Sequence, residues 1–176
     1  IAFMNGGGIR ADIAVGDITY NDLLSVFPYS NTICVAEVTG SQIRDALEMG
    51  VKNYPEENGG FLQVAGLSYT IDSSIPSGVQ MDQKGNFLGV DGEYRVTDIE
   101  VNGEALDLEQ TYTLASHSYM LKSYGDGMTM FQGCNIIQDD IAVDVDVLSN
   151  YLTEALNGVI GDSYSNPQGD GRITIK

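Results

Sequence analysis

Three glycines followed by an arginine stand near the start of the chain, in the stretch NGGGIRADI that begins at Asn5. Adjacent glycines let backbone N–H groups approach an anion closely, and a guanidinium matches two phosphate oxygens at once. The stretch therefore fits a phosphate site in which Arg10 holds the anion. Its spacing matches neither the Walker A nor the dinucleotide-binding glycine motif. From this loop alone, a plain turn after a strand explains the glycines better.

A second glycine-bearing loop, SYGDG, places Asp126 between two glycines. The turn would expose the carboxylate and fix its direction, and a carboxylate can accept two hydrogen bonds from the vicinal hydroxyls of a ribose. The chain has 25 acidic residues, so a solvated aspartate in a turn is the simpler interpretation of this loop by itself.

Two tyrosines supply the aromatic groups that a nucleoside site needs. Tyr29 follows Pro28, and Tyr119 follows the strand that leads to the Asp126 loop. Two rings that face each other can hold a base between them, with stacking of about 1–3 kcal/mol per base. Packing in the core, the usual role of a tyrosine near a strand, is the alternative. The single histidine, His117, lacks a nucleophile arrangement and is interpreted as a structural or rim residue.

The elements that would position these loops follow one another in an irregular order. Amphipathic helices are expected at 39–55, capped by Thr39 or Ser41, and at 144–158, and a shorter helix is expected to begin after Asn21. Residues 73–92 are interpreted as a long surface excursion. Strands are expected at 1–5, 31–38, 59–72, 94–106, 110–120 and 171–176. This order lacks a regular βαβ rhythm and predicts an α+β fold, a single domain with mixed β-sheets and flanking helices.

Composition narrows the classes of partner. The 176 residues suit one domain with a real core, and the net charge of −17 would repel nucleic acid and anionic lipid. No apolar run is long enough to cross a membrane. Cys34 and Cys134 are expected to be free thiols, and no spacing typical of a zinc site occurs.

Taken in order, these stretches resemble the C-terminal domain of the 5′-nucleotidase family. The resemblance covers nearly the whole chain through NGGGIR, GDITYNDLLSVFPYSNTICVAEVTGSQIRDALE, GGFLQVAGLSYTID, YTLASHSYM, YGDG and the closing GRITI. It implies six substrate-binding residues: Asn5 and Gly7 in the pocket wall, Arg10 on the phosphate, Tyr29 and Tyr119 on the two faces of the base, and Asp126 on the ribose hydroxyls. The family often has phenylalanine at both stacking positions and a glycine where this chain has Tyr124.

In this family, which includes UDP-sugar hydrolases and cyclic-nucleotide phosphodiesterases, catalysis takes place on an N-terminal metallophosphoesterase domain with a divalent metal pair. The resemblance implies that this chain lacks that domain, and also lacks the helix that opens the family's C-terminal domain. We therefore expect a fragment or mature piece with no catalytic residue, no metal ligand and no cofactor of its own. Its partners would be a nucleotide or nucleoside and the N-terminal domain.

The resemblance further implies an extracellular, periplasmic or cell-wall location in a bacterium. Apolar surface left by the missing helix would favour a dimer of the fragment. Two alternatives stay open. One is a non-catalytic module that binds nucleotides or nucleosides, and the other is the thiosulfate-oxidising relative of the family, against which the paired aromatic residues argue.

Overall fold

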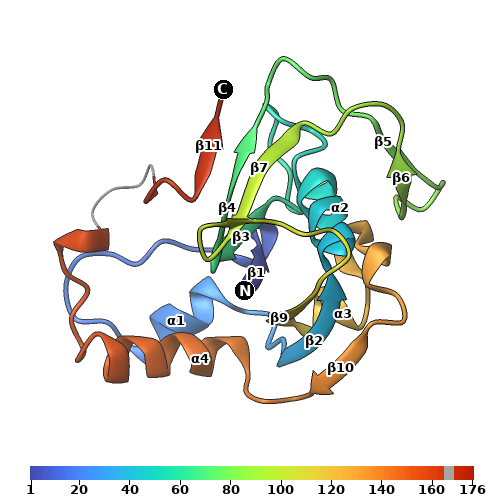
Figure 1. Cartoon of the computed structure of the whole chain (residues 1–176). Coiled ribbons are helices and arrows are strands. Elements are labelled where there is room, and N and C mark those ends of the chain that lie inside the picture. Colours follow the sequence, from blue (N-terminus) through green and yellow to red (C-terminus); the bar gives the residue numbers. More distant parts are fainter. Residues whose placement is uncertain (165–168) are drawn as a thin grey trace.

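Two mixed β-sheets form the framework of the structure (Figure 1), a computed structural model that describes residues 1–164 and 169–176. In the larger sheet, β9 pairs parallel with β1, and the other neighbours are antiparallel. From one edge to the other its strands are β10 (Asn135–Gln138), β2 (Ile33–Thr39), β9 (Thr111–His117), β1 (Ala2–Asn5) and β3 (Leu62–Ala65). The α+β fold with mixed sheets that the sequence predicts is confirmed.

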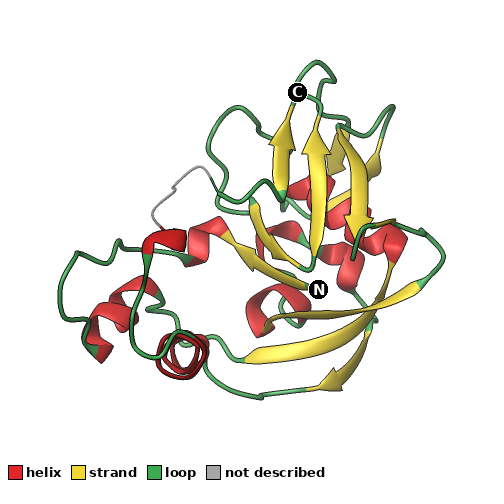
Figure 2. Cartoon of the chain, turned by 60° about the vertical axis from the view of Figure 1, so that its left-hand side comes forward, coloured by secondary structure: helices red, strands yellow, loops and turns green. Residues whose placement is uncertain are grey.

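The smaller sheet has four strands, and a separate two-stranded hairpin stands beside it. The C-terminal strand forms one edge of the four-stranded sheet, as both views show (Figures 1 and 2). In order, the sheet contains β11 (Ile173–Ile175), β4 (Leu67–Ile71), β7 (Val96–Val101) and β8 (Glu104–Ala105), and the hairpin contains β5 (Val79–Met81) and β6 (Phe87–Val90). Residues 73–92, interpreted as a long surface excursion, contain this hairpin, which was not predicted because its strands are too short for periodicity to reveal.

Helix α2 (Gly40–Gly50) contacts both sheets, through β2 of the larger and β7 of the smaller. A capping box starts it: the Gln42 amide donates to Thr39 Oγ1 at 3.2 Å, and the Thr39 amide donates to Gln42 Oε1 at 2.8 Å. Ile43, Ala46 and Leu47 are fully buried at helical spacing. The predicted amphipathic helix is confirmed, with Thr39 as the cap of the two candidates, but it ends at Gly50 and residues 51–55 form turns.

The predicted strand at 59–72 is divided at Gly66 into β3 and β4, which belong to different sheets. Gly66 has a φ of +76°, and a Cβ there would lie 3.1 Å from the Cα of Ile1. Only glycine combines this backbone conformation with this close approach. The chain therefore passes from one sheet to the other at this residue.

Helices α1 (Tyr20–Val26) and α4 (Asp144–Asn150) pack against each other beside the larger sheet (Figure 1). The N-cap of α1 is Thr19, whose amide donates to Asp22 at 2.7 Å, so the expected cap at Asn21 is wrong. The remaining helical turns are short: η1 (Gly6–Gly8), α3 (Ser118–Leu121), η2 (Gly125–Gly127), η3 (Thr129–Phe131), the π-helical η4 (Tyr151–Ala155) that continues α4, and η5 (Asp162–Tyr164).

A buried arginine joins the end of α2 to the smaller sheet. Arg95, just before β7, donates to the backbone oxygens of Val51, Tyr54 and Ile75 at 2.7–3.1 Å. The fully buried Glu48 accepts the backbone N–H groups of Arg95 and of its neighbour at 3.2 and 2.9 Å. Burial raises the pKa of Glu48, and the charges of nearby arginines oppose this shift. This group of contacts fixes how α2 lies against β7.

Candidate functional site

The site forms at the edge of the larger sheet where β1 and β9 both end. These two strands are parallel neighbours, so their carboxyl ends, Asn5 and His117, meet at the same edge. Strand β2 runs antiparallel to β9 and begins with Ile33 opposite His117. The turn before β2, which contains Tyr29, is thereby brought to the same edge. Carboxyl ends of parallel strands are frequent ligand sites in α/β proteins for this geometric reason.

A cavity of about 370 Å³ opens at this edge. Its volume suits a small-molecule ligand. Its lining residues come from segments far apart in the sequence: Asn5, Gly7, Gly8, Tyr29, Asn31, Tyr119 and Asp126. The structure thus brings together five of the six residues selected from the sequence. The sixth, Arg10, is not a lining residue; it is exposed, and its Nη1 donates to the Gly7 oxygen at 3.3 Å.

The glycine loop is a turn, and not a cradle made by the amides of Gly6 and Gly7. The Gly6 amide donates to the Phe61 oxygen at 2.7 Å, and the Gly7 amide donates to the Gly59 oxygen at 2.8 Å. A Cβ on Gly7 would lie 3.1 Å from the Gly59 backbone. These glycines therefore allow close packing of two loops, and the amides of Gly6 and Gly7 are not available to an anion.

Both tyrosine rings are partly open to solvent instead of packed in the core. Tyr29 is 59% exposed and Tyr119 is 38% exposed. Desolvation raises the pKa of Tyr119, and the nearby Asp126 charge raises it further, so the phenol stays protonated at neutral pH. Because exposed aromatic rings that line a cavity are available for stacking, the arrangement favours ligand binding over the alternative of core packing.

The Asp126 carboxylate is held in place by two side chains. Asn5 Nδ2 donates to one carboxylate oxygen at 2.6 Å, and the Tyr119 hydroxyl donates to the other at 3.2 Å. Tyr124 and Asp126 both have a φ of +55°, and a Cβ at Gly125 would meet the Tyr119 ring at 2.2 Å. The loop therefore follows a tight path over the ring that only glycine at 125 permits.

Sequence reasoning missed two residues of the cavity wall, Gly8 and Asn31, and gave only a structural or rim role to His117, which contacts Asn5 of that wall. Asn31 lines the cavity from the turn that carries Tyr29, and its place two residues after that ring was the available signal. His117 is 1% exposed, and its Nε2 lies 3.0 Å from Asn5 Oδ1. Burial lowers the pKa of His117, although the charges of Asp144 and Asp126 act in the opposite direction.

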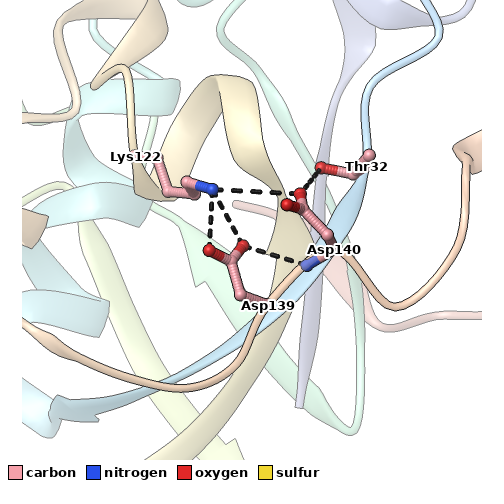
Figure 3. A network of polar contacts seen from close by, with 4 residues as sticks. All are labelled: Thr32, Lys122, Asp139 and Asp140. Atoms are coloured by element: carbon pink, nitrogen blue, oxygen red, sulfur yellow. Dashed lines mark hydrogen bonds and ion pairs between the residues drawn. The ribbon is translucent and has the colours of Figure 1, made fainter.

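A network of polar contacts ties together the segments that carry the two rings (Figure 3). Lys122, three residues after Tyr119, lies 2.8 Å from Asp139 and 3.9 Å from Asp140. Thr32, three residues after Tyr29, donates to Asp140 Oδ1 at 2.7 Å. The network therefore links the end of α3 to the residue before β2 through Asp139 and Asp140.

Removing this lysine should have a small, salt-dependent effect. We expect Lys122→Met to lower the thermal unfolding midpoint slightly in dilute buffer, and the difference should disappear at about 1 M salt because screening weakens exposed ion pairs. Differential scanning fluorimetry at both salt concentrations measures this. Lys84→Met is the matched control, because it removes an exposed lysine whose backbone amide, and not its ammonium group, donates to Asp82. If the unfolding midpoint of Lys122→Met stays below that of the unmodified chain at high salt, the contribution of Lys122 is not electrostatic.

Among residues 1–164 and 169–176, no three His, Cys, Asp or Glu side chains are grouped so that they could hold a metal ion. No helix in those ranges combines the length and the apolar character that a bilayer crossing requires. Cys34 is buried and Cys134 is half-buried, and both are free thiols.

The structure is thus an α+β domain with a cavity that has aromatic walls and a fixed carboxylate, features that are common in small-molecule sites. The sequence family described as 5′-nucleotidase, C-terminal domain, matches residues 1–133. The chain belongs to this family, as the resemblance of its motifs predicts.

Similarity to individual proteins agrees with the family. The chain is 34% identical over 178 residues to the trifunctional nucleotide phosphoesterase protein YfkN of Bacillus subtilis (strain 168), covering 98% of this chain and 11% of that protein. It is 28% identical over 169 residues to a 5′-nucleotidase of Vibrio vulnificus (strain CMCP6), a match that covers 96% of this chain and 26% of that protein. The crystal structure of a 5′-nucleotidase precursor from Thermus thermophilus matches with a TM-score of 0.79 and 34% identity, covering 99% and 31%. The chain therefore spans less than a third of the length of each of these proteins.

Proposed function

We propose that this domain binds the nucleoside part of a nucleotide and presents it to a separate catalytic domain of a phosphohydrolase that hydrolyses nucleotide phosphate esters. The observation that carries the proposal is the pair of exposed tyrosine rings lining one cavity with a fixed carboxylate. Stacking on both faces suits any base, and a carboxylate suits the ribose hydroxyls.

Each residue selected from the sequence has a place in this proposal. Tyr29 and Tyr119 stack on opposite faces of the base, and Asp126 accepts hydrogen bonds from the ribose. Asn5 and Gly7 form the wall next to the nucleoside. Arg10 is exposed, and its Nη1 donates to the oxygen of Gly7, a residue of the cavity wall. From this position its guanidinium would bind the phosphate.

The hydrolytic step belongs to the whole protein, whose relatives are more than three times as long as this chain. We propose that an N-terminal metallophosphoesterase domain supplies a divalent metal pair there, in line with the relative described as a nucleotide phosphoesterase. Such a metal pair would polarise the phosphate and activate water. This chain would then contribute positioning of the substrate. We also propose an extracellular, periplasmic or cell-wall location.

Calorimetric titration of the chain tests the binding proposal. We expect adenosine and uridine to bind, and ribose 5-phosphate, which lacks a base to stack, to bind at least about tenfold more weakly. The chain alone should not release phosphate from AMP. Equal binding of ribose 5-phosphate and the nucleosides would contradict the stacking role, and no binding of any nucleoside would contradict the proposal as a whole.

A further inference from the structure

A chain of hydrogen bonds runs from the buried His117 to the Asp126 carboxylate through Asn5. His117 Nε2 lies 3.0 Å from Asn5 Oδ1, and Asn5 Nδ2 lies 2.6 Å from Asp126 Oδ2. An ionised carboxylate only accepts hydrogen bonds, so the amide group of Asn5 must face Asp126. Its oxygen then faces His117, and Nε2 of His117 must be the donor.

The surroundings of His117 favour this one tautomer. His117 and Asn5 are both buried, and His117 Nδ1 has no hydrogen-bond partner among the described residues. Since burial lowers the pKa of the ring, the imidazole is neutral at neutral pH and carries one proton. Asn5 donates through Nδ2 to Asp126, so its Oδ1 is left to accept from the ring and the proton resides on Nε2. A neutral His117 with its proton on Nε2 thus matches the direction that Asp126 imposes on the Asn5 amide, and holds that amide from the other side.

The carboxylate retains acceptor capacity toward the cavity. A carboxylate has about four lone-pair sites. Asn5 occupies one site on Asp126 and the Tyr119 hydroxyl occupies another. About two sites remain, which is the number that a vicinal diol requires. The His117 ring also lies 5.8 Å from the Tyr119 ring, tilted by 46°, so it supports the residues on both sides of the carboxylate.

We propose that His117 is a positioning residue for ribose recognition, which orients Asn5 and through it the Asp126 carboxylate toward the vicinal hydroxyls of the ligand. This inference rests on the proposed nucleoside-binding function. His117 touches no ligand itself. A purely structural histidine would affect all ligands of the cavity equally, whereas a positioning residue affects those that have the diol.

Two variants of similar volume separate these roles. His117→Met removes the N–H donor, and His117→Gln keeps a side-chain N–H that reaches Asn5 Oδ1. Calorimetry compares adenosine with 2′,3′-dideoxyadenosine, which keeps the base and lacks both hydroxyls. We expect the unmodified chain to prefer adenosine by about tenfold or more, because hydrogen bonds to a charged group contribute most.

In His117→Met this preference should fall to about unity, while the affinity for dideoxyadenosine changes by less than about twofold. His117→Gln should recover most of the preference. Thermal unfolding confirms that each variant is folded. Retention of the preference in His117→Met, or equal loss of both affinities, would overturn the positioning role.

A second measurement keeps the two proposals distinguishable. NMR of the side-chain amide of Asn5 reports its hydrogen bond to Asp126 without any ligand. We expect slow exchange of these protons with solvent in the unmodified chain and in His117→Gln, and faster exchange in His117→Met. Unchanged exchange in His117→Met would overturn the positioning role of His117 and leave the proposed nucleoside-binding function standing. If the unmodified chain binds neither compound, the proposed function fails, and the inferred role in ribose recognition fails with it.

Discussion

Replacing Tyr29 and Tyr119 together by alanine should reduce the affinity of the domain for adenosine by roughly 30-fold or more. Each ring that stacks on a base contributes about 1–3 kcal/mol, and every 1.4 kcal/mol corresponds to about a tenfold change in affinity. Both rings are partly exposed, so their removal opens little of the core, and the Tyr119 change also removes the hydroxyl that donates to Asp126, which adds to the loss of affinity. The loss should therefore appear in the dissociation constant measured by calorimetry, with little change in the thermal unfolding midpoint.

Matched variants identify the ring as the cause. Tyr29→Phe keeps the stacking surface and should bind adenosine within a few-fold of the unmodified chain, whereas Tyr94→Ala removes a ring that packs under Arg44, away from the cavity. In the full-length protein, the double alanine variant should lose nucleotide hydrolysis and keep most of its activity on a small aryl phosphate, which has no nucleoside to position. An equal loss of both activities would refute the stacking assignment.

Arg95→Met should be among the most destabilising single changes in this chain, with a loss of about 3–5 kcal/mol in the free energy of unfolding. The substitution keeps apolar volume but leaves the backbone oxygens of Val51, Tyr54 and Ile75 without their donor. It also removes a positive charge near the buried Glu48 carboxylate. Chemical denaturation with urea at neutral pH measures the loss.

The loss of stability in Arg95→Met should depend on pH because the pKa of Glu48 is raised in the folded state. Burial raises the pKa of Glu48, and Arg95 opposes that shift, so its removal raises the pKa further. A group with a raised pKa in the folded state stabilises the fold at low pH and loses this contribution as the pH rises. The difference in the free energy of unfolding between Arg95→Met and the unmodified chain should therefore become smaller as the pH falls from about 7 to about 5.

Arg44→Met provides the control, because Arg44 lies on the same helix as Glu48, half-buried over the Tyr94 ring at 4.0 Å. Arg44→Met likewise removes a positive charge near Glu48, together with the cation–π contact to Tyr94. We expect it to lower the free energy of unfolding by about 0.5–1 kcal/mol. Similar deficits for the two variants would show that charge alone, and not the buried contacts of Arg95, accounts for the effect.

Most of the cavity was predictable because its residues belong to motifs with a recognisable order. Tyr29, Tyr119 and Asp126 were individually ambiguous, since each had a simpler interpretation as a core or turn residue. Only their combination with the glycine loop favoured a nucleoside site. Asn31 and His117 escaped selection because neither residue type at its position carries a distinctive pattern. The contact that gives His117 its place is with Asn5, 112 residues away in the sequence.

The glycine loop shows the limit of local inference. Its composition permits an anion cradle, yet the amides of Gly6 and Gly7 donate to Phe61 and Gly59, which lie more than 50 residues further along the chain. Hydrogen bonds between distant loops leave no periodic signal in the sequence. The same holds for Gly66, where a predicted single strand became two because the residue packs against Ile1.

The sequence by itself determined the α+β class, a helix that begins near Thr39, and the family, because periodicity, capping and ordered motifs are local properties of the chain. Tertiary structure alone decided which polar groups meet. The parallel pairing of β1 with β9 places Asn5 beside His117, and the turn at 124–127 places Asp126 within reach of Asn5. Hydrogen-bond direction depends on atoms brought together by folding, and so the arrangement that positions the carboxylate became visible only in three dimensions.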